Sequence, residues 1–444
     1  MMSRTRRSRT WRTSCEKEAV ELARQAGLRQ RTLSFTQVAS VLVWGWWKQP
    51  QAGPSALARF AGSLEVTLEK QTVACHLTER TANWLRALLQ RVVAQVVCAQ
   101  AIALPLLQQL GAVLLEDGST ISLPPAWQSV WRGCGGHASS SERQSQTQAA
   151  LKLTLRGDLL HGQLHGPHLP EGRRHELASL LHQQEMAKGS LWIADLGYWT
   201  LTWLQHLSRQ GVFFLLRYKP GIVLWLHHER LDLLSVLPQV VGQRLELLVD
   251  VGASQLLKGV RLLAERVPAE GVEPRHQRIA RSAQTHGKPI NPLVWELAHW
   301  TLLVTNVPQT MLSFEQVRAL LRARWPIELL FKLWKAHGLL AEWSSRQPWA
   351  ILCEVSAKLI ALVVQHWFVL LSWWDDPHHR LSSVAEVVRE QLPTLGHGLC
   401  GHLPLGRAIR LLVHRVGGGC AIPKRTTRLS TSYRLLSLWE SGLT

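Results

Sequence analysis

Three carboxylates, far apart in the sequence, have the type and setting that metal-dependent chemistry on phosphates requires. Asp117 follows the apolar run at residues 113–115, Asp195 follows the apolar run of "SLWIADLGYW", and Glu328 stands in "RARWPIELLFKLWKAHG". Mg²⁺ prefers hard oxygen ligands and keeps positions open for water and phosphate oxygens. Two such ions can activate a water or a 3′-hydroxyl and stabilise the leaving oxygen. The three acids therefore predict a two-metal phosphoryl-transfer site.

Cations surround the third acid. On a helix, Arg324, Glu328, Lys332 and Lys335 share one face, because they are spaced by four, four and three residues. Such a face would hold the scissile phosphates, although a solvated stripe of salt bridges has the same pattern. Pro326 indicates a kink or a helix start beside it.

Composition favours a polyanionic partner. The 444 residues carry a formal net charge of +19, and 46% of them are hydrophobic, which excludes a disordered tail. Nucleic acid is the usual partner of such a basic chain, and a basic membrane-surface protein is the alternative. The cysteines show no CxxC pair and the N-terminus no secretory signal, so we expect a cytoplasmic protein. The apolar stretch from Ile351 contains Glu354 and Lys358, which favours a core helix over a membrane span.

The first two acids must be positioned by strands. Residues 1–104 show helical periodicity and are predicted to be a helical region that binds DNA, or else an ordinary packing domain. A strand is then predicted to end at Asp117, because Gly118 follows it. Alternation on both sides of residues 156–158 predicts a hairpin, residues 173–185 read as a helix, and a further strand ends at Asp195.

Residues 213–305 read as a β-rich insertion of short strands, with a mobile basic loop at 273–289. Ser313 and Gln316 predict a capping box that starts the helix leading toward Glu328. Residues after about 380 read as a short helix, a glycine-rich break and a basic tail.

The third acidic segment resembles a family signature. "RARWPIELLFKLWK" is similar to the pattern Y-x2-R-x3-E-x6-K of bacterial insertion-sequence transposases of the DDE class, in the insertion-sequence-four superfamily. Arg324, Glu328 and Lys335 occupy its R, E and K, and Trp325 and Ile327 also match.

The first two acids also stand in family-like segments. "EDGST" resembles the first-aspartate segment, with Asp117 as the acid, and "IADLGYW" resembles the second, with Asp195. The resemblance extends over roughly residues 105 to 375, with the three motifs in the family order.

This resemblance implies an α/β fold: a ribonuclease-H-like mixed-sheet core at 105–212 and 306–380, interrupted by the β-rich insertion at 213–305, with helical regions at 1–104 and 381–444. It implies cut-and-paste transposition, in which Asp117, Asp195 and Glu328 hold two Mg²⁺ ions, replaceable by Mn²⁺. The implied partners are double-stranded DNA, as terminal inverted repeats and target, and a second copy of the chain in a synaptic homodimer. No nucleotide cofactor is implied, and the bacterial protein would associate with the nucleoid.

The resemblance also implies DNA contacts. Trp300 matches a tryptophan that stacks on a flipped base, although 21 tryptophans in the chain make a core role as plausible. "FFLLRYK" is similar to a family strand whose basic residues contact phosphate. The implied DNA-binding residues are Arg217, Lys219, Trp300, Arg324, Trp325, Lys332 and Lys335.

Two positions depart from the family pattern. The signature tyrosine is replaced by Leu321, and the residue after the second aspartate, often arginine, is Leu196. Both changes remove groups that contact DNA and leave the acids intact. A catalytically inactive, transposase-derived DNA-binding protein and a nuclease of the same fold that performs no strand transfer are therefore the alternatives.

Overall fold

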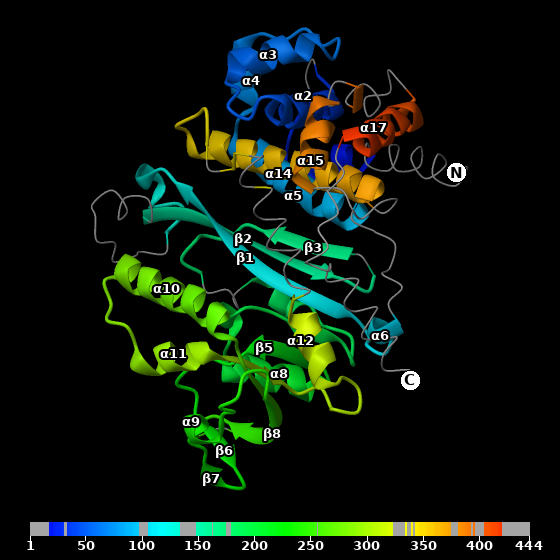
Figure 1. The fold of residues 1–444 in the computed structure, drawn as a ribbon. Helices are drawn as coiled ribbons and strands as arrows, with labels where there is room; N and C mark the ends of the chain where they lie inside the picture. Colours follow the sequence, from blue (N-terminus) through cyan, green and yellow to red (C-terminus); the bar gives the residue numbers. More distant parts are fainter. Residues whose placement is uncertain are drawn as a thin grey trace. The chain divides into compact units, whose positions relative to one another are not determined.

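The computed structural model describes residues 17–30, 33–96, 105–133, 148–161, 163–174, 179–254, 256–322, 334, 339–340, 342–373, 381–391, 394–395 and 404–419. The chain divides into two compact units (Figure 1). The helical unit consists of Met1–Ala99 and Leu329–Arg428 with the short segment Leu164–Pro167. The sheet unit consists of Gln100–Gln163, His168–Glu328 and Leu429–Thr444.

The helical unit joins helices from both ends of the chain. Residues 17–25 are helical, as the sequence predicts. α2 begins with a capping box, in which Ser34 and Gln37 exchange hydrogen bonds of 2.9 Å and 3.2 Å. The labelled helices are α2 (Phe35–Lys48), α3 (Pro54–Gly62), α4 (Lys70–His76), α5 (Glu79–Val96), α14 (Pro348–Trp373), α15 (Leu381–Glu390) and α17 (Leu405–Gly419).

α14 is the central helix of this unit and packs against α2, α5 and α15. Among the described residues it is the one helix long and apolar enough to cross a membrane, over the window Pro348–Gln365, but 89% of that window is buried within the protein. Burial of this kind is what the prediction of a core helix requires. Inside α14, Lys358 Nζ lies 2.8 Å from a Glu354 carboxylate oxygen and also donates to the carbonyls of Leu339 and Glu342, at 3.2 Å and 2.7 Å.

The sheet unit is built on a ten-stranded mixed sheet with the strand order β3-β2-β1-β4-β5-β10-β9-β8-β6-β7. β1 and β4 pair in parallel, as do β4 and β5, whereas β10 is antiparallel to both β5 and β9. The strands are β1 (Val113–Leu123), β2 (Ala149–Asp158), β3 (Gln163–His168), β4 (Leu191–Ile193), β5 (Phe213–Arg217), β6 (Leu224–Leu226), β7 (Glu229–Arg230), β8 (Arg244–Val251), β9 (Leu257–Arg266) and β10 (Trp300–Thr305).

One face of this sheet is covered by a continuous apolar core. The side chains of Leu114, Trp192 and Phe214, at neighbouring register positions of three strands, belong to it, together with Leu204 and Leu207 of α8. The remaining helices of the unit are α6 (Pro105–Gln108), η1 (Pro125–Trp127), η3 (Leu180–Gln183), η4 (Leu196–Tyr198), α8 (Leu201–Arg209), α9 (Leu233–Val236), α10 (Ala269–His286), α11 (Pro292–Glu296), η5 (Leu297–His299) and α12 (Phe314–Arg322).

The short strands predicted between residues 213 and 305 are confirmed as β5, β6, β8, β9 and β10. They do not form a separate sheet, because all of them join the same ten-stranded sheet. The predicted mobile basic loop at 273–289 is wrong: most of it belongs to the 18-residue helix α10, which ends at His286 and is capped by Gly287 in the left-handed conformation (φ 60°). Glycine adopts that conformation without steric cost, so it suits a helix C-terminus.

The hairpin prediction is right in kind and displaced in position. Residues 156–158 belong to β2, and the turn follows at residues 159–161. Asp158 holds this turn, because its carboxylate accepts hydrogen bonds from the backbone amides of Leu160 and His161, at 2.9 Å and 3.2 Å. At the other end of the chain, the glycines placed in a break form the last turn of α17. The basic tail that follows lies outside the described residues.

Candidate active site

β1 carries Asp117 near its middle. The prediction that this strand ends at Gly118 is wrong, because β1 continues to Leu123 and pairs antiparallel with β2 along residues 114–123. Asp117 lies opposite Leu155 and is half-buried, and its carboxylate accepts a 2.8 Å hydrogen bond from the amide of Gly118. Long-range pairing therefore overrides the local turn signal.

Asp195 lies at the matching position of the neighbouring strand. In the parallel pair of β1 and β4, Leu115 is opposite Ile193, and the two acids each follow two residues later. Asp195 retains extended backbone (φ −88°, ψ 172°) and is exposed. Alternate residues of a strand share a face. Asp117 and Asp195 therefore lie on one face of the sheet, on strands about 4.8 Å apart.

β5 adds cations to the same row. Ile193 is opposite Leu215 in the parallel pair of β4 and β5, so Arg217 is in register with Asp195. Tyr218 is buried in the core on the opposite face, so continued alternation just past the end of β5 would place Lys219 on the face of the acids. Arg217 and Lys219 are both exposed. We call the face that bears Asp117, Asp195, Arg217 and Lys219 the acid face.

Glu116 points to the other side of the sheet, where it is fully buried. Its Oε2 accepts hydrogen bonds from Arg156 Nε at 3.0 Å and from Trp192 Nε1 at 2.9 Å, and Arg156 Nη2 is 2.9 Å away. His182 Nε2 lies 3.1 Å from the other carboxylate oxygen. Glu116, Arg156, His182 and Trp192 thus form a buried polar cluster that connects β1, β2, β4 and η3.

No sequence pattern indicated this role for Glu116 and Arg156. The available signal was their placement: they are direct partners in the antiparallel pair of β1 and β2, and opposite charges at facing positions stabilise a strand pair. The helix predicted over 173–185 is not confirmed in its described C-terminal part. Residues 180–183 form the short 3₁₀ helix η3 there. Ser179 caps η3, and His182 on it reaches the Glu116 cluster.

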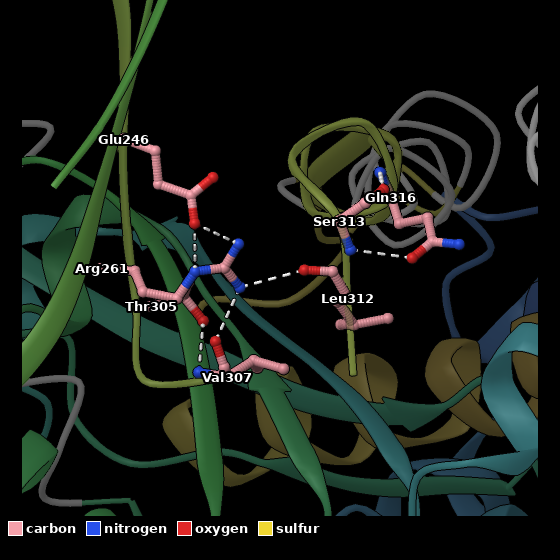
Figure 2. A network of polar contacts seen from close by, with 7 residues as sticks. All are labelled: Glu246, Arg261, Thr305, Val307, Leu312, Ser313 and Gln316. Atoms are coloured by element: carbon pink, nitrogen blue, oxygen red, sulfur yellow. Dashed lines mark hydrogen bonds and ion pairs between the residues drawn. The ribbon is translucent and has the colours of Figure 1, made fainter. Parts of the chain in front are cut away.

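The connection from β10 to α12 leads the chain toward the third acid. Arg261 of β9, only 3% exposed, pairs with Glu246 of β8 through Nε and Nη2, at 2.7 Å and 2.6 Å. Its Nη1 donates to the carbonyls of Val307 and Leu312, at 2.7 Å and 3.0 Å, which fixes both ends of the connecting loop (Figure 2).

The capping box predicted at the start of α12 is confirmed. Ser313 N donates to Gln316 Oε1 at 2.9 Å, and Gln316 N donates to Ser313 Oγ at 3.4 Å (Figure 2). α12 itself ends at Arg322, six residues before Glu328 in the sequence. Leu321, which takes the place of the signature tyrosine, lies in its last turn.

Residues 323–333 and 335 of the signature segment lie outside the described residues. This holds for the third acid and for the DNA contacts that the resemblance implies beside it, which are Arg324, Trp325, Glu328, Lys332 and Lys335. Within the described part of the chain, no group of three histidine, cysteine or acidic side chains is placed to hold a metal ion. The structure therefore brings two of the predicted acids together on one face, with two of the predicted cations.

Trp300 lies in the core. It is 5% exposed, its indole Nε1 donates a 2.7 Å hydrogen bond to the carbonyl of Pro238, and the guanidinium of Arg266 lies 4.9 Å from the ring centroid. Because the ring is buried and Arg266 lies over it, a base could stack on Trp300 only after the surrounding side chains rearrange. Leu196 packs against the same apolar core.

Comparison with known proteins adds a family to this geometry. A family model described as the transposase DDE domain matches residues 111–364, more than half of the chain. The transposase for insertion sequence element IS231F of Bacillus thuringiensis subsp. israelensis is 23% identical over 369 residues, covering 77% of this chain and 75% of that protein. The transposase for IS1151 of Clostridium perfringens is 22% identical over 280 residues, covering 59% and 57%.

Proposed function

Since the chain belongs to the transposase DDE domain family, among the transposases of bacterial insertion sequences, we propose that it moves its own insertion sequence by a cut-and-paste reaction. In this reaction the DNA strands are cleaved at the element ends, and the freed 3′-hydroxyls attack target DNA. The observation that carries the proposal is the common register of Asp117 and Asp195 on the acid face. The protein would act in the cytoplasm, on the DNA of the nucleoid.

The catalytic residues that we propose are Asp117, Asp195 and Glu328. The described pair fits a divalent metal: both are carboxylates, they share a face, and no described residue forms an ion pair with the exposed Asp195. Hard oxygen donors of this kind suit Mg²⁺, and Mn²⁺ accepts the same ligands. When two ions are bound, they supply activation of the attacking oxygen and neutralisation of the leaving oxygen.

The chain's own residues supply the DNA contacts. Arg217 is in register with Asp195, so a phosphate beside the acids lies within reach of its guanidinium, which can bind phosphate oxygens in a bidentate manner. Lys219 adds a second positive charge on the same face. By family resemblance, Arg324, Trp325, Lys332 and Lys335 contact the DNA near Glu328. Two element ends must be cut together, so we expect a homodimer in the DNA complex.

The test is nicking of supercoiled plasmid in Mg²⁺ or Mn²⁺, which requires no knowledge of the terminal repeats. Asp117→Asn, Asp195→Asn and Glu328→Gln should each abolish nicking and leave DNA binding largely intact. Asp232→Asn is the matched control, because Asp232 is exposed and caps α9 with a side-chain oxygen that asparagine retains. Full nicking activity in any of the three acid variants would refute the site assignment.

Two outcomes separate the alternatives. A nuclease of the same fold would nick plasmid but would not join a labelled oligonucleotide with a free 3′-hydroxyl to target DNA. An inactive DNA-binding derivative would bind plasmid and would not nick it with either metal.

A further inference from the structure

α10, in the sheet unit, carries arginines in a stretch that the sequence predicted to be a loop. Its residues Arg275 and Arg278 are three apart and therefore lie on the same side of the helix. Arg278 is exposed, and Arg275 is half-buried. Arg278 and Lys288 also line a hollow of about 490 Å³ between α10 and the start of α11.

Three hydrogen bonds fix Arg275 to β10 and to η5, which precedes it. Its Nη1 donates to the carbonyls of Ala298 and Trp300, at 3.0 Å and 2.7 Å, and its Nη2 donates to Thr301 Oγ1 at 2.9 Å. All three acceptors are uncharged. These three bonds fix the position of the guanidinium, and none of their acceptors offsets its positive charge.

The Thr301 side chain identifies the face on which this guanidinium lies. Its neighbours Trp300 and Leu302 are buried in the apolar core on one side of the sheet, so Thr301 points to the other side. Leu303 is opposite Arg217 in the antiparallel pair of β10 and β5, and alternate residues share a face. Arg275 thus reaches the acid face one strand away from Arg217 and Lys219.

Among the described residues, the cations on this face form no ion pairs. In the part of the chain that the structure describes, no carboxylate lies within ion-pair distance of Arg217, Lys219, Arg275 or Arg278. The pKa of Arg275 is lowered by burial and then by the positive charges of Arg217 and Arg278, so both arginines act electrostatically on Arg275. Like charges gathered in this way repel each other unless an anion binds between them.

We propose that Arg275 and Arg278 of α10 bind the phosphodiester backbone of DNA together with Arg217 and Lys219, extending the acid face across β10. This inference rests on the proposed function, because DNA is the polyanion that a transposase holds on the face of its acids. Arg275 provides a fixed charge at β10, and the exposed Arg278 makes the direct contact at the edge. Arginine suits the role because its planar fork matches phosphate oxygens.

The experiment measures the affinity of a fluorescein-labelled duplex of mixed sequence, by anisotropy, over a range of salt concentrations in EDTA. One phosphate contact contributes about 0.9 to the slope of log K against log salt, and so a factor of about eight in affinity at 0.1 M salt. Arg278→Gln should reduce the slope by about 0.9 and the affinity at 0.1 M salt by a factor of about eight. Arg278→Lys keeps the charge and should retain the slope.

The matched control is Arg244→Gln. Arg244 is an arginine of the same unit with a 45% exposed side chain, and it forms ion pairs with Glu265 and Glu315. Its removal should leave the slope unchanged, although the net charge falls by the same amount. If Arg278→Gln keeps the wild-type slope, or loses no more than Arg244→Gln, the proposal is overturned. Loss of slope in Arg278→Lys as well would also overturn it, because the effect would then be structural.

Failure of this proposal can be told apart from failure of the proposed function. DNA binding in EDTA does not depend on cleavage, whereas plasmid nicking in Mg²⁺ depends on the three acids. If Arg278→Gln shows a normal slope and the wild type nicks plasmid, the proposed DNA contact of α10 is refuted and the proposed transposase function stands. If Arg278→Gln shows a reduced slope and the wild type does not nick plasmid, the proposed DNA contact of α10 stands and the result argues against the proposed cleavage activity.

Discussion

Replacement of Glu116 by glutamine should destabilise the sheet unit strongly, although it changes only one functional group. Glu116 is fully buried, its carboxylate accepts hydrogen bonds from Arg156 and Trp192, and His182 Nε2 lies 3.1 Å from its other oxygen. Glutamine has the same length, but it carries no charge and places an amide nitrogen among groups that are themselves donors. Arg156, with only 3% of its side chain exposed, would then be a buried cation without a carboxylate.

The expected cost is about 3–5 kcal/mol in the free energy of unfolding, the usual result of removing one partner of a buried ion pair. That is a large part of the roughly 5–15 kcal/mol by which folded proteins are stable. The measurement is equilibrium denaturation followed by tryptophan fluorescence. A double variant, Glu116→Leu with Arg156→Met, buries no unpaired charge and should recover part of the loss.

The control is the adjacent acid. Asp117→Asn changes a half-buried carboxylate on the other face, so its cost should be about 1 kcal/mol or less. A loss below about 1 kcal/mol for Glu116→Gln, or an equal loss for the two variants, would refute the view that Glu116 serves stability and Asp117 serves chemistry.

Two further predictions concern the helical unit. Lys358→Met should cost about 3–5 kcal/mol in a denaturation experiment, because Glu354 loses its buried partner. Burial raises the pKa of Glu354, and the charge of Lys358 partly offsets this rise. Without Lys358 the folded state therefore binds the Glu354 proton more tightly than the unfolded state does. The variant's stability should therefore be highest below pH 4.5 and fall as the pH rises, and a rise would contradict the assignment. Burial also raises the pKa of the Cys353 thiol to about 12, whereas Cys75 is exposed. Iodoacetamide at mildly alkaline pH should label Cys75 and spare Cys353 in the native protein, as peptide mass spectrometry can check; equal labelling would contradict the burial of Cys353.

Local patterns in the sequence predicted local structure well. The strands between residues 213 and 305 alternate or run apolar for a few residues, and the structure confirms them. The capping box at Ser313 and Gln316 depends on groups three residues apart, and it forms as expected. Asp195 lies two residues beyond the end of β4 at Ile193, close to the strand end that the apolar run before it predicts.

Features that depend on distant partners were predicted poorly. Gly118 signalled the end of a strand, but pairing with β2, whose residues come some 35 positions later, carries β1 through it. Residues 273–289 looked like a loop because they contain Pro274 and many charges, yet α10 forms there and Arg275 attaches it to β10. The register of Asp117 with Asp195 follows from the parallel pairing of β1 with β4, which no nearby residue specifies. The role and placement of Glu328 remain predictions.

The pairing of β5 with β10 affects how the chain folds during its synthesis. In this pair Leu303 is opposite Arg217, so 86 residues must be translated before β5 gains its second neighbour. At about 5–20 residues per second this takes about 4 to 17 seconds. Meanwhile β8 and β9 can pair through their short connection, but β5 presents an open edge that other chains could join. The yield of folded protein would then depend on how well that edge is protected in the nascent chain, more than on the stability of the finished sheet.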